Sequence, residues 1–367
     1  MVDELVLKPV GVNVSKIGAV SPNGRYVLAS GFYKKFSFVV FDTRTGAQVS
    51  VVPAFYDEII DHLTWAPDSK AVMATSTHAL FLFNDVVDNP RDQPDLLLTV
   101  DAKFVAVYCA PNGLFFIADR TGAVVMWDFE TRSMLTKLEF NHPRIDHASM
   151  TLVRTHFVMC SFGMPDGSDA THAHLDVVNV KTGKRIVASE LYAEGDTINS
   201  VDVAQNGRTV VLVSGPDLHL VHLDATTHAP KKPTKIFDSK RIAKAMFSPD
   251  GRFLVCIAES PRTTFVTNVH VWDLETGRMH AQFDSYDYLL SFSPDSHYMF
   301  YSNPDMDLVR RPMSVEISAL HVAAAHPPLP AIMSDEETEW RPRSMVSRRP
   351  TIAGPNVTKL VGRYEMG

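Results

Sequence analysis

A four-residue turn of the type Ser-Pro-Asp-Gly recurs along the chain, and each copy precedes a short apolar run. Neighbouring copies start 44 or 45 residues apart, except across one central interval of 94 residues that holds two periods. A fixed period of this length indicates a repeat architecture in which every unit is one small supersecondary element. With a degraded copy near residues 151–162, the chain contains seven units. The recognisable copies begin at Ser21, Ala66, Ala110, Ala204, Ser248 and Ser293.

The residues of this turn favour a tight reversal between two strands. Proline presets φ at the second position, and Asp or Asn followed by Gly tolerates the left-handed backbone of the reversal. The apolar runs that follow are short and rich in β-branched and aromatic residues, as strands require. Several runs are apolar at consecutive positions, which is typical of strands covered on both faces. The sequence therefore predicts an all-β chain.

A second repeated element has the same period. An apolar run ends in an aromatic or aliphatic residue followed by Asp or Asn, and in several copies a Thr-Gly turn comes next. The stretch VVNVKTG supplies this element to the degraded fourth unit, whereas the seventh unit has only a poor match near residues 313–317. The pairs are Phe41-Asp42, Phe83-Asn84, Trp127-Asp128, Val178-Asn179, Leu223-Asp224 and Trp272-Asp273.

These two elements resemble the WD40-repeat family over about residues 4–325, although the family's Gly-His dipeptide is absent. The pattern is similar to divergent propellers, including those of eukaryotic translation initiation factors of the 2A kind. The resemblance implies a seven-bladed β-propeller, in which four-stranded blades pack around a central channel.

The resemblance also predicts how the chain is divided. We expect the propeller to span residues 1–333, and residues 334–367 to form a flexible, disordered tail of mixed charge. The last unit is one strand short, and residues 4–10 have no unit of their own. We therefore expect residues 4–10 to close the last blade, with Leu5 to Lys8 as its outer strand.

Composition excludes several classes of function. The formal net charge of −7 argues against a general nucleic-acid binder, which needs a basic face. Cys109, Cys160 and Cys256 are far apart, each in or beside an apolar run, and form no Cys-x-x-Cys pair. They predict neither a zinc site nor a redox motif, and we expect them to be small buried hydrophobic residues. No apolar run is long enough to span a membrane, and the first residues do not resemble a signal peptide. We expect a location in the cytoplasm, with the nucleus as the alternative.

Catalytic motifs are absent from the sequence. There is no Gly-x-Ser-x-Gly elbow and no phosphate-binding glycine loop. His172 and His174 form an alternating pair near Asp166 and Asp169, which on a strand could share a metal ion. No spacing fixes a third ligand, so we expect these histidines to be structural or to face solvent. The sequence predicts no enzyme activity, cofactor, metal or small-molecule substrate.

Partner-binding residues are expected on one face of the ring. The connections between second and third strands and between blades share that face, and they carry aromatic and basic residues, the usual anchors of interfaces. The tail offers a docking tryptophan and hydroxyls next to acidic or basic residues, which suit kinases. The predicted ring residues are Phe32, Tyr33, Lys34, Lys35, Phe55, Tyr56, Arg144, Phe162, Arg241, Arg262 and Tyr286. The predicted tail residues are Ser334, Trp340, Ser344, Ser347 and Thr351.

Three functions remain open from the sequence. The first is a non-catalytic scaffold that mediates protein–protein interactions within a multiprotein complex. The alternative is an RNA- or ribosome-associated factor, whose binding would weaken as salt rises. The third is a propeller enzyme, which bound metal or ester hydrolysis would reveal. The sequence names neither the partner nor the pathway.

Overall fold

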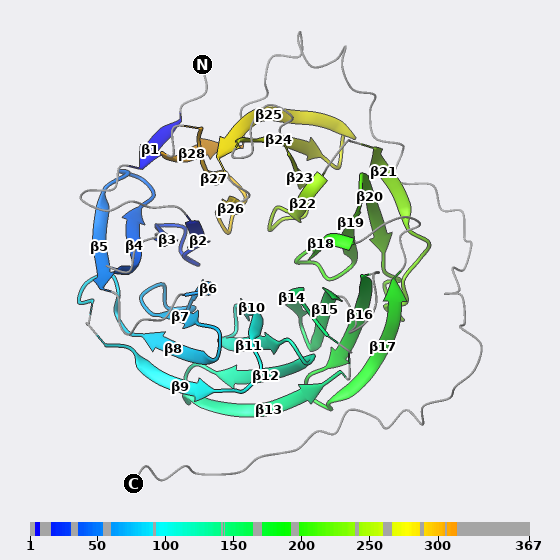
Figure 1. The fold of residues 1–367 in the computed structure, drawn as a ribbon, viewed down its shortest axis with the longest axis horizontal. Coiled ribbons are helices and arrows are strands. Elements are labelled where there is room, and N and C mark those ends of the chain that lie inside the picture. Colours follow the sequence, from blue (N-terminus) through cyan, green and yellow to red (C-terminus); the bar gives the residue numbers. More distant parts are fainter. Residues whose placement is uncertain are drawn as a thin grey trace.

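The chain forms a ring of seven small antiparallel β-sheets around a central channel, as the computed structural model in Figure 1 shows. Each sheet has four strands, and the described residues contain no helix. The seven-bladed all-β prediction is therefore confirmed. The structure describes residues 4–7, 16–30, 36–53, 60–90, 93–140, 142, 144–163, 171–191, 198–238, 242–259, 266–286, 290–304 and 307–313.

The first six blades each use four consecutive strands, with the first strand beside the channel and the fourth at the rim (Figure 1). Blade 1 is β2 (Lys16–Val20), β3 (Tyr26–Ser30), β4 (Phe36–Asp42) and β5 (Gln48–Pro53). Blade 2 is β6 (His62–Trp65), β7 (Val72–Thr75), β8 (Ala79–Phe83) and β9 (Asp95–Thr99). Blade 3 is β10 (Phe104–Cys109), β11 (Leu114–Asp119), β12 (Ala123–Asp128) and β13 (Ser133–Glu139).

The second half of the ring repeats this order. The degraded turn of the fourth unit lies between β14 and β15, where Arg154 takes a left-handed φ of 55° in place of a glycine. Blade 4 is β14 (His147–Val153), β15 (His156–Gly163), β16 (His172–Asn179) and β17 (Lys184–Leu191). Blade 5 is β18 (Ile198–Val203), β19 (Thr209–Ser214), β20 (Asp217–His222) and β21 (Thr234–Asp238). Blade 6 is β22 (Ile242–Phe247), β23 (Phe253–Glu259), β24 (Val266–Asp273) and β25 (Arg278–Tyr286).

The seventh blade joins both ends of the described chain. It consists of β26 (Leu290–Phe292), β27 (Tyr298–Ser302), β28 (Leu308–Pro312) and β1 (Leu5–Leu7). The strand β1 pairs antiparallel with β28, with Leu5 opposite Arg310 and Leu7 opposite Leu308. The segment Leu5–Leu7 thus holds the outer position for which the sequence proposes it, while Lys8 lies outside the described residues.

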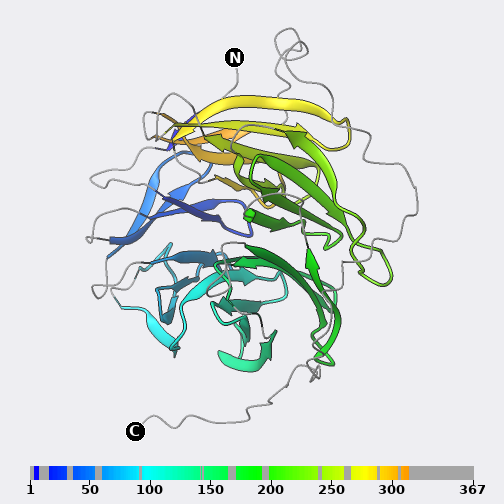
Figure 2. The ribbon, with the colours of Figure 1, turned by 45° about the vertical axis from the view of Figure 1, so that its right-hand side comes forward.

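The apolar core lies between neighbouring blades. Figure 2 shows adjacent sheets packed against one another, and the buried clusters draw residues from two blades at a time. Phe116 of blade 3 stacks on Phe157 of blade 4, with 4.4 Å between ring centroids. Trp65 of blade 2 donates its indole N–H to the carbonyl of Ala19 in blade 1 at 3.0 Å. A blade therefore buries its faces only when both neighbours are present.

The repeated turn is held by its own serine and acidic side chains. In blade 6 the Ser248 hydroxyl donates to Asp250 Oδ1 at 2.5 Å and accepts the Phe253 amide at 2.8 Å. Blades 1 and 7 repeat this arrangement with Ser21 and Ser293. Backbone groups that no strand partner reaches are thereby satisfied within the turn.

The acidic residue after the third strand fixes the next turn. Asp273 Oδ1 accepts the amides of Glu275 at 2.9 Å and Thr276 at 3.0 Å, and Oδ2 accepts Arg252 Nη2 at 2.7 Å. Burial raises the pKa of Asp273, but the Arg252 guanidinium and these amides outweigh it, so the pKa lies below its usual value. The same contacts recur at Asp42 in blade 1.

The antiparallel order gives the ring two different faces. The connections between first and second strands and between third and fourth strands lie on one face, which we call the turn face. The connections between second and third strands, and those between blades, lie on the opposite face, which we call the loop face. Much of the loop face lies outside the described residues, including residues 31–35, 54–59, 164–170, 192–197 and 260–265.

Candidate functional site

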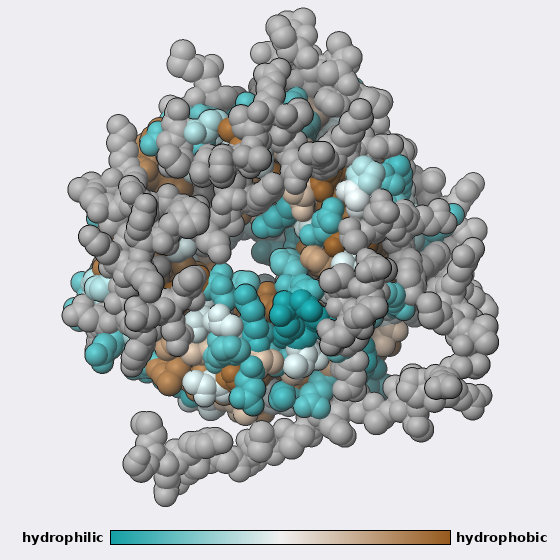
Figure 3. Space-filling model, viewed as in Figure 1, coloured by the Kyte–Doolittle hydropathy of each residue, from teal (hydrophilic) through white to brown (hydrophobic). Residues whose placement is uncertain are grey.

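The central channel contains a concave site that both polar and apolar side chains line. Figure 3 shows the opening through the ring, with hydrophilic residues along its margin. A cavity of about 310 Å³ lies there among the first strands of blades 2 to 6. It is lined by His62, Val105, Ala106, Val107, Tyr108, His147, Ala148, Ser149, Met150, Val201, Asp202, Lys244, Ala245 and Met246.

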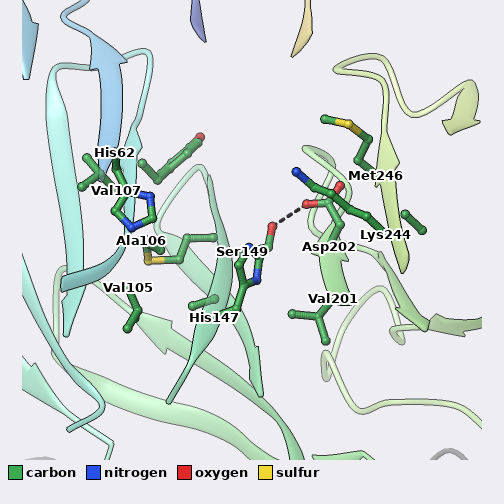
Figure 4. A pocket seen from close by; sticks show the side chains of 14 residues that line it. His62, Val105, Ala106, Val107, His147, Ser149, Val201, Asp202, Lys244 and Met246 are labelled. Atoms are coloured by element: carbon green, nitrogen blue, oxygen red, sulfur yellow. Dashed lines mark hydrogen bonds between the residues drawn. The ribbon is translucent and has the colours of Figure 1, made fainter. Parts of the chain in front are cut away.

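The first strands contribute both polar and apolar side chains to the cavity. On β14, Ala148 and Met150 are buried between blades, whereas His147 and Ser149 are partly exposed. On β18, Asp202 lies between the buried residues Val201 and Val203 and is likewise partly exposed. Side chains of a strand point alternately to opposite faces of its sheet, so Ala148 and Met150 pack toward blade 3, whereas Ser149 faces blade 5. Figure 4 shows Ser149 and Asp202 pointing toward each other across the gap between their strands.

Asp202 connects three blades around the channel. Its Oδ1 accepts the Ser149 hydroxyl of blade 4 at 2.6 Å, and its Oδ2 accepts the Phe247 amide of blade 6 at 2.8 Å. The Ser149 oxygen in turn accepts the Val203 amide at 3.1 Å. Burial raises the pKa of Asp202 although these hydrogen bonds and nearby Lys244 act in the opposite direction. The Ser149 hydroxyl thus uses both its donor and an acceptor site in hydrogen bonds that join blades 4 and 5.

His147 contributes a neutral imidazole to the same cavity. Burial lowers its pKa to about 4, and the nearby charge of Lys244 acts in the same direction. Its Nδ1 is inaccessible to solvent and has no hydrogen-bond partner among the described residues. A buried polar atom without a partner costs free energy, and native structures contain few of them. The Nδ1 atom is therefore a buried polar group that the described residues leave unsatisfied.

Two of the predicted loop-face residues can be placed completely. Phe162, in β15, is half-buried against the cluster between blades 4 and 5, and its ring lies 5.7 Å from that of His147. Arg144 Nε donates to Asp146 Oδ1 at 3.1 Å, and Arg120 Nη2 contacts the same oxygen at 2.7 Å. Phe162 thus packs beneath the loop face and onto a residue of the channel.

The other predicted site residues cannot be compared with the structure. Tyr286 ends β25, but its side chain lies outside the described residues. The same is true of the whole of Phe32, Tyr33, Lys34, Lys35, Phe55, Tyr56, Arg241, Arg262, Ser334, Trp340, Ser344, Ser347 and Thr351.

The histidine pair considered for metal binding has other partners. His172 Nδ1 contacts Glu190, and the His174 ring stacks on His142 with 4.2 Å between centroids. Burial lowers the pKa of His174 to about 4. The described residues contain no group of three or more His, Cys, Asp or Glu that could hold a metal ion. Asp166 and Asp169 lie outside them.

Sequence reasoning missed a charged network between blades 3 and 4. Asp176 on β16 is fully buried and accepts His142 Nε2 at 2.5 Å, while Arg185 contacts its other oxygen. The Arg185 guanidinium lies 5.4 Å from the centroid of the Phe140 ring. Asp176 interrupts the apolar run of residues 175–178 within β16, and this is the signal of the network that the sequence offers. It joins the blades but lies outside the channel cavity.

The cysteines fit the structural role expected from the sequence. Cys160 and Cys256 are buried, and Cys109 is half-buried. All three thiols are free, and burial raises the pKa of Cys109 and of Cys256 to about 12. Such thiols stay protonated at neutral pH, so they are poor nucleophiles and poor metal ligands.

Comparisons with known proteins assign no function to the chain. No protein-family model matches the sequence. The curated proteins contain no significant match either. Within the described residues, no helix has the length and apolarity needed to cross a bilayer. Any functional conclusion therefore depends on the ring, its two faces and the channel.

Proposed function

We propose that this protein is a non-catalytic interaction platform, a divergent WD40-like propeller that recruits partner proteins through its loop face. The observation that carries the proposal is the architecture. A closed ring of seven blades presents one face of tight turns and one face of blade-connecting loops around the mouth of a polar channel. Rigid scaffolds that display loops commonly bind through those loops.

The turn face provides a contrast within the same molecule. Its turns satisfy their own polar groups through Ser248, Asp250 and Asp273 and their equivalents. Such turns leave few donors or acceptors for a partner. The loop face carries the aromatic and basic residues that the sequence offers as anchors, and aromatic residues with arginine dominate interface energetics.

An affinity-capture comparison tests the loop-face proposal. The tagged full-length protein is compared with the double variant Tyr33→Ala/Tyr56→Ala on the loop face and with Arg44→Ala on the turn face. We expect the loop-face variant to lose the proteins captured by the wild type, and the turn-face variant to keep them. Equal capture by all three proteins would contradict the proposal. Thermal unfolding of each variant shows whether the ring remains intact.

The same capture with nuclease and a salt series examines the RNA-associated alternative. If the platform acts on proteins directly, nuclease leaves the captured set unchanged. Partners that disappear with nuclease, and RNA binding that weakens steeply as salt rises, would instead favour the alternative.

A further inference from the structure

Blades 4 and 5, which are neighbours in the ring (Figure 1), carry a group of positive charges on their turn face. The group consists of six exposed lysine and arginine side chains, and none of them forms an ion pair with another described residue. Lys235, a few residues further along blade 5, instead pairs with Asp217 at 2.8 Å. The six residues, which we call the basic patch, are Arg154, Lys181, Lys184, Arg208, Lys231 and Lys232.

Hydrogen bonds hold together the connections that carry the basic patch within each blade. In blade 4 the Val180 amide donates to the Thr155 carbonyl at 2.9 Å, which keeps the two turns of that blade side by side. In blade 5 the Leu223 amide donates to the Arg208 carbonyl at 2.7 Å and has the same effect. The connections are residues 154–155 and 180–183 of blade 4, and residues 204–208 and 223–233 of blade 5.

Two contacts then join blade 4 to blade 5 on this face. The rings of His156 and His228 lie 4.8 Å apart between centroids. A Cβ on Gly207 would lie 2.8 Å from Val153 Cγ2, so the first turn of blade 5 packs directly on the end of β14. Burial lowers the pKa of His228, and the nearby charges of His156 and Arg208 act in the same direction, so its ring stays neutral at neutral pH. The six cations therefore belong to one surface that crosses two blades.

Asp224 is the one acid in these four connections. Its Oδ1 accepts the Thr226 amide at 2.9 Å, the Thr227 amide at 2.7 Å and the Thr227 hydroxyl at 2.9 Å. These hydrogen bonds lower the pKa of Asp224, so it remains ionised and bound within its own turn. Six cations and one acid give the surface a formal charge of +5, in a chain whose net charge is −7.

Acidic turns border the basic patch on both sides, which limits the length of an anionic ligand. Blade 3 exposes Glu130, and its Arg132 already pairs with Asp95 at 3.3 Å. Blade 6 exposes Glu275, and its Arg252 is paired with acidic side chains of the same blade. A nucleic-acid strand repeats its negative charge at every nucleotide and would meet these acids as it continues. An acidic segment of a few residues fits within the two blades.

We infer that the basic patch binds a short acidic segment of a partner protein, rich in glutamate or aspartate. The argument is charge complementarity, because a concentrated positive surface without ion pairs of its own is bordered by negative charge. Exposed ion pairs are individually weak, so binding depends on several pairs at once and weakens as salt rises. The inference goes beyond recruitment through the loop face, since this surface lies on the opposite face and uses none of the loop-face residues.

Fluorescence anisotropy of the full-length protein tests the inference with two labelled peptides of eight residues, in which glycine alternates with either glutamate or glutamine. At about 50 mM salt the glutamate peptide should bind at least about tenfold more tightly, and at about 300 mM salt this preference should largely disappear. The variant Lys181→Glu/Lys231→Glu reverses one charge on each blade and should remove the preference. The variant Lys181→Arg/Lys231→Arg should keep it.

Lys70→Glu/Lys137→Glu is the matched control, because it changes the net charge equally but on blades 2 and 3, where both lysines already have acidic partners. It should bind both peptides nearly as the wild type does. Equal binding of the two peptides by the wild type, or the same loss in both charge-reversal variants, would overturn the inference. Thermal unfolding checks that each variant is folded, and Lys181→Gln/Lys231→Gln replaces the charge reversal if that variant is not.

The same assay separates two other occupants. An RNA of eight uridines that binds more tightly than the glutamate peptide would overturn the inference in favour of nucleic acid. Residues 335–339 of this chain contain four acids. Peptide binding that occurs only after these four are replaced by their amides would overturn it in favour of the chain's own segment. Capture through the loop face is measured with different variants, so failure here is distinguishable from failure of the proposed function.

Discussion

In two copies of the repeated turn a serine stands at the last position, where other copies have glycine, and its hydroxyl forms a hydrogen bond that glycine cannot form. Ser69 and Ser296 have φ values of 57° and 59°, a region that side chains with a Cβ rarely adopt. Their hydroxyls accept backbone amides from the turn of the preceding blade, Asn23 to Ser69 at 3.1 Å and Asp250 to Ser296 at 3.0 Å. The backbone strain is thus accompanied by a hydrogen bond between blades.

Substitutions of Ser69 separate the strain from the hydrogen bond. Ser69→Ala keeps the left-handed strain and loses the acceptor, so we expect the free energy of unfolding to fall by about 1 kcal/mol. Ser69→Gly loses the same acceptor but relieves about 1 kcal/mol of strain, so it should remain close to the wild type. Urea unfolding measures both. A glycine variant that is less stable than the alanine variant would contradict this explanation.

His147 should make the stability of the ring depend on pH. Its pKa is about 4 when folded and 6.5 when unfolded, so the unfolded chain binds more protons between these values. Stability is then fully present above pH 6.5 and is lost as the pH falls toward 4. The full shift corresponds to at most about 3 kcal/mol.

Replacement of His147 by phenylalanine removes this titration. Urea unfolding at pH 7.0 and pH 4.5 should show a smaller loss of stability in His147→Phe than in the wild type. The raised pKa of Asp202 acts in the opposite sense and is common to both proteins, so the difference between them is the informative quantity. Identical pH dependence of the two proteins would show that His147 is not buried as described.

At the scale of the element, the short strand β1 depends on contacts from two blades. Leu7 is fully buried, and Glu4 Oε1 accepts Tyr301 Oη at 3.1 Å and Arg311 Nη1 at 3.3 Å in blade 7. Blade 1 approaches from the other side, where a Cβ on Gly46 would lie 2.9 Å from the Val6 carbonyl oxygen. Three strand residues are therefore fixed by side chains distant in sequence.

Two glycines have similar backbone conformations but differ in how close they lie to β1. Gly24 and Gly46 have φ values of 71° and 73°, but a Cβ on Gly24 would meet nothing within 4 Å. Gly24→Ala should cost about 1 kcal/mol from left-handed strain alone. Gly46→Ala should cost at least about 1 kcal/mol more, because it forces β1 to move. If thermal unfolding shows the same loss of stability in both alanine variants, Gly46 does not limit how closely β1 packs on blade 1.

At the scale of the whole molecule, the ring is closed by only one noncovalent junction. Every other blade is continuous in the chain, but blade 7 takes its outer strand from the beginning of the sequence. Because each core cluster is shared between neighbouring blades, opening one junction exposes apolar surface on both sides of it. The stability of the molecule therefore depends on a few residues near its first strand.

Deletion of residues 1–10 tests this dependence. It removes Leu7 from the core and leaves the outer edge of β28 unpaired. Burying one leucine contributes about 1.5–3 kcal/mol, so the melting temperature should fall by roughly several degrees. Leu7→Ala in the full-length chain is the milder form of the same change and should shift it less. An unchanged melting curve for the deletion would refute closure by β1.

The sequence by itself determined the number of blades, because a blade is built from neighbouring residues and its turns repeat their chemistry at a fixed period. Ser248, Asp250 and Asp273 make contacts within a few residues or across one hairpin, so their roles follow from local pattern. The degraded fourth unit was placed correctly for the same reason.

Only the tertiary structure decided what meets between blades and inside the channel. Ser149 and Asp202, or His142 and Asp176, lie on separate sheets, and no periodicity specifies which polar side chains converge. Their meeting depends on how far each sheet twists and on how the closed ring aligns its strands. Pattern along a chain reports local geometry, whereas a site formed by several blades exists only after the ring has closed.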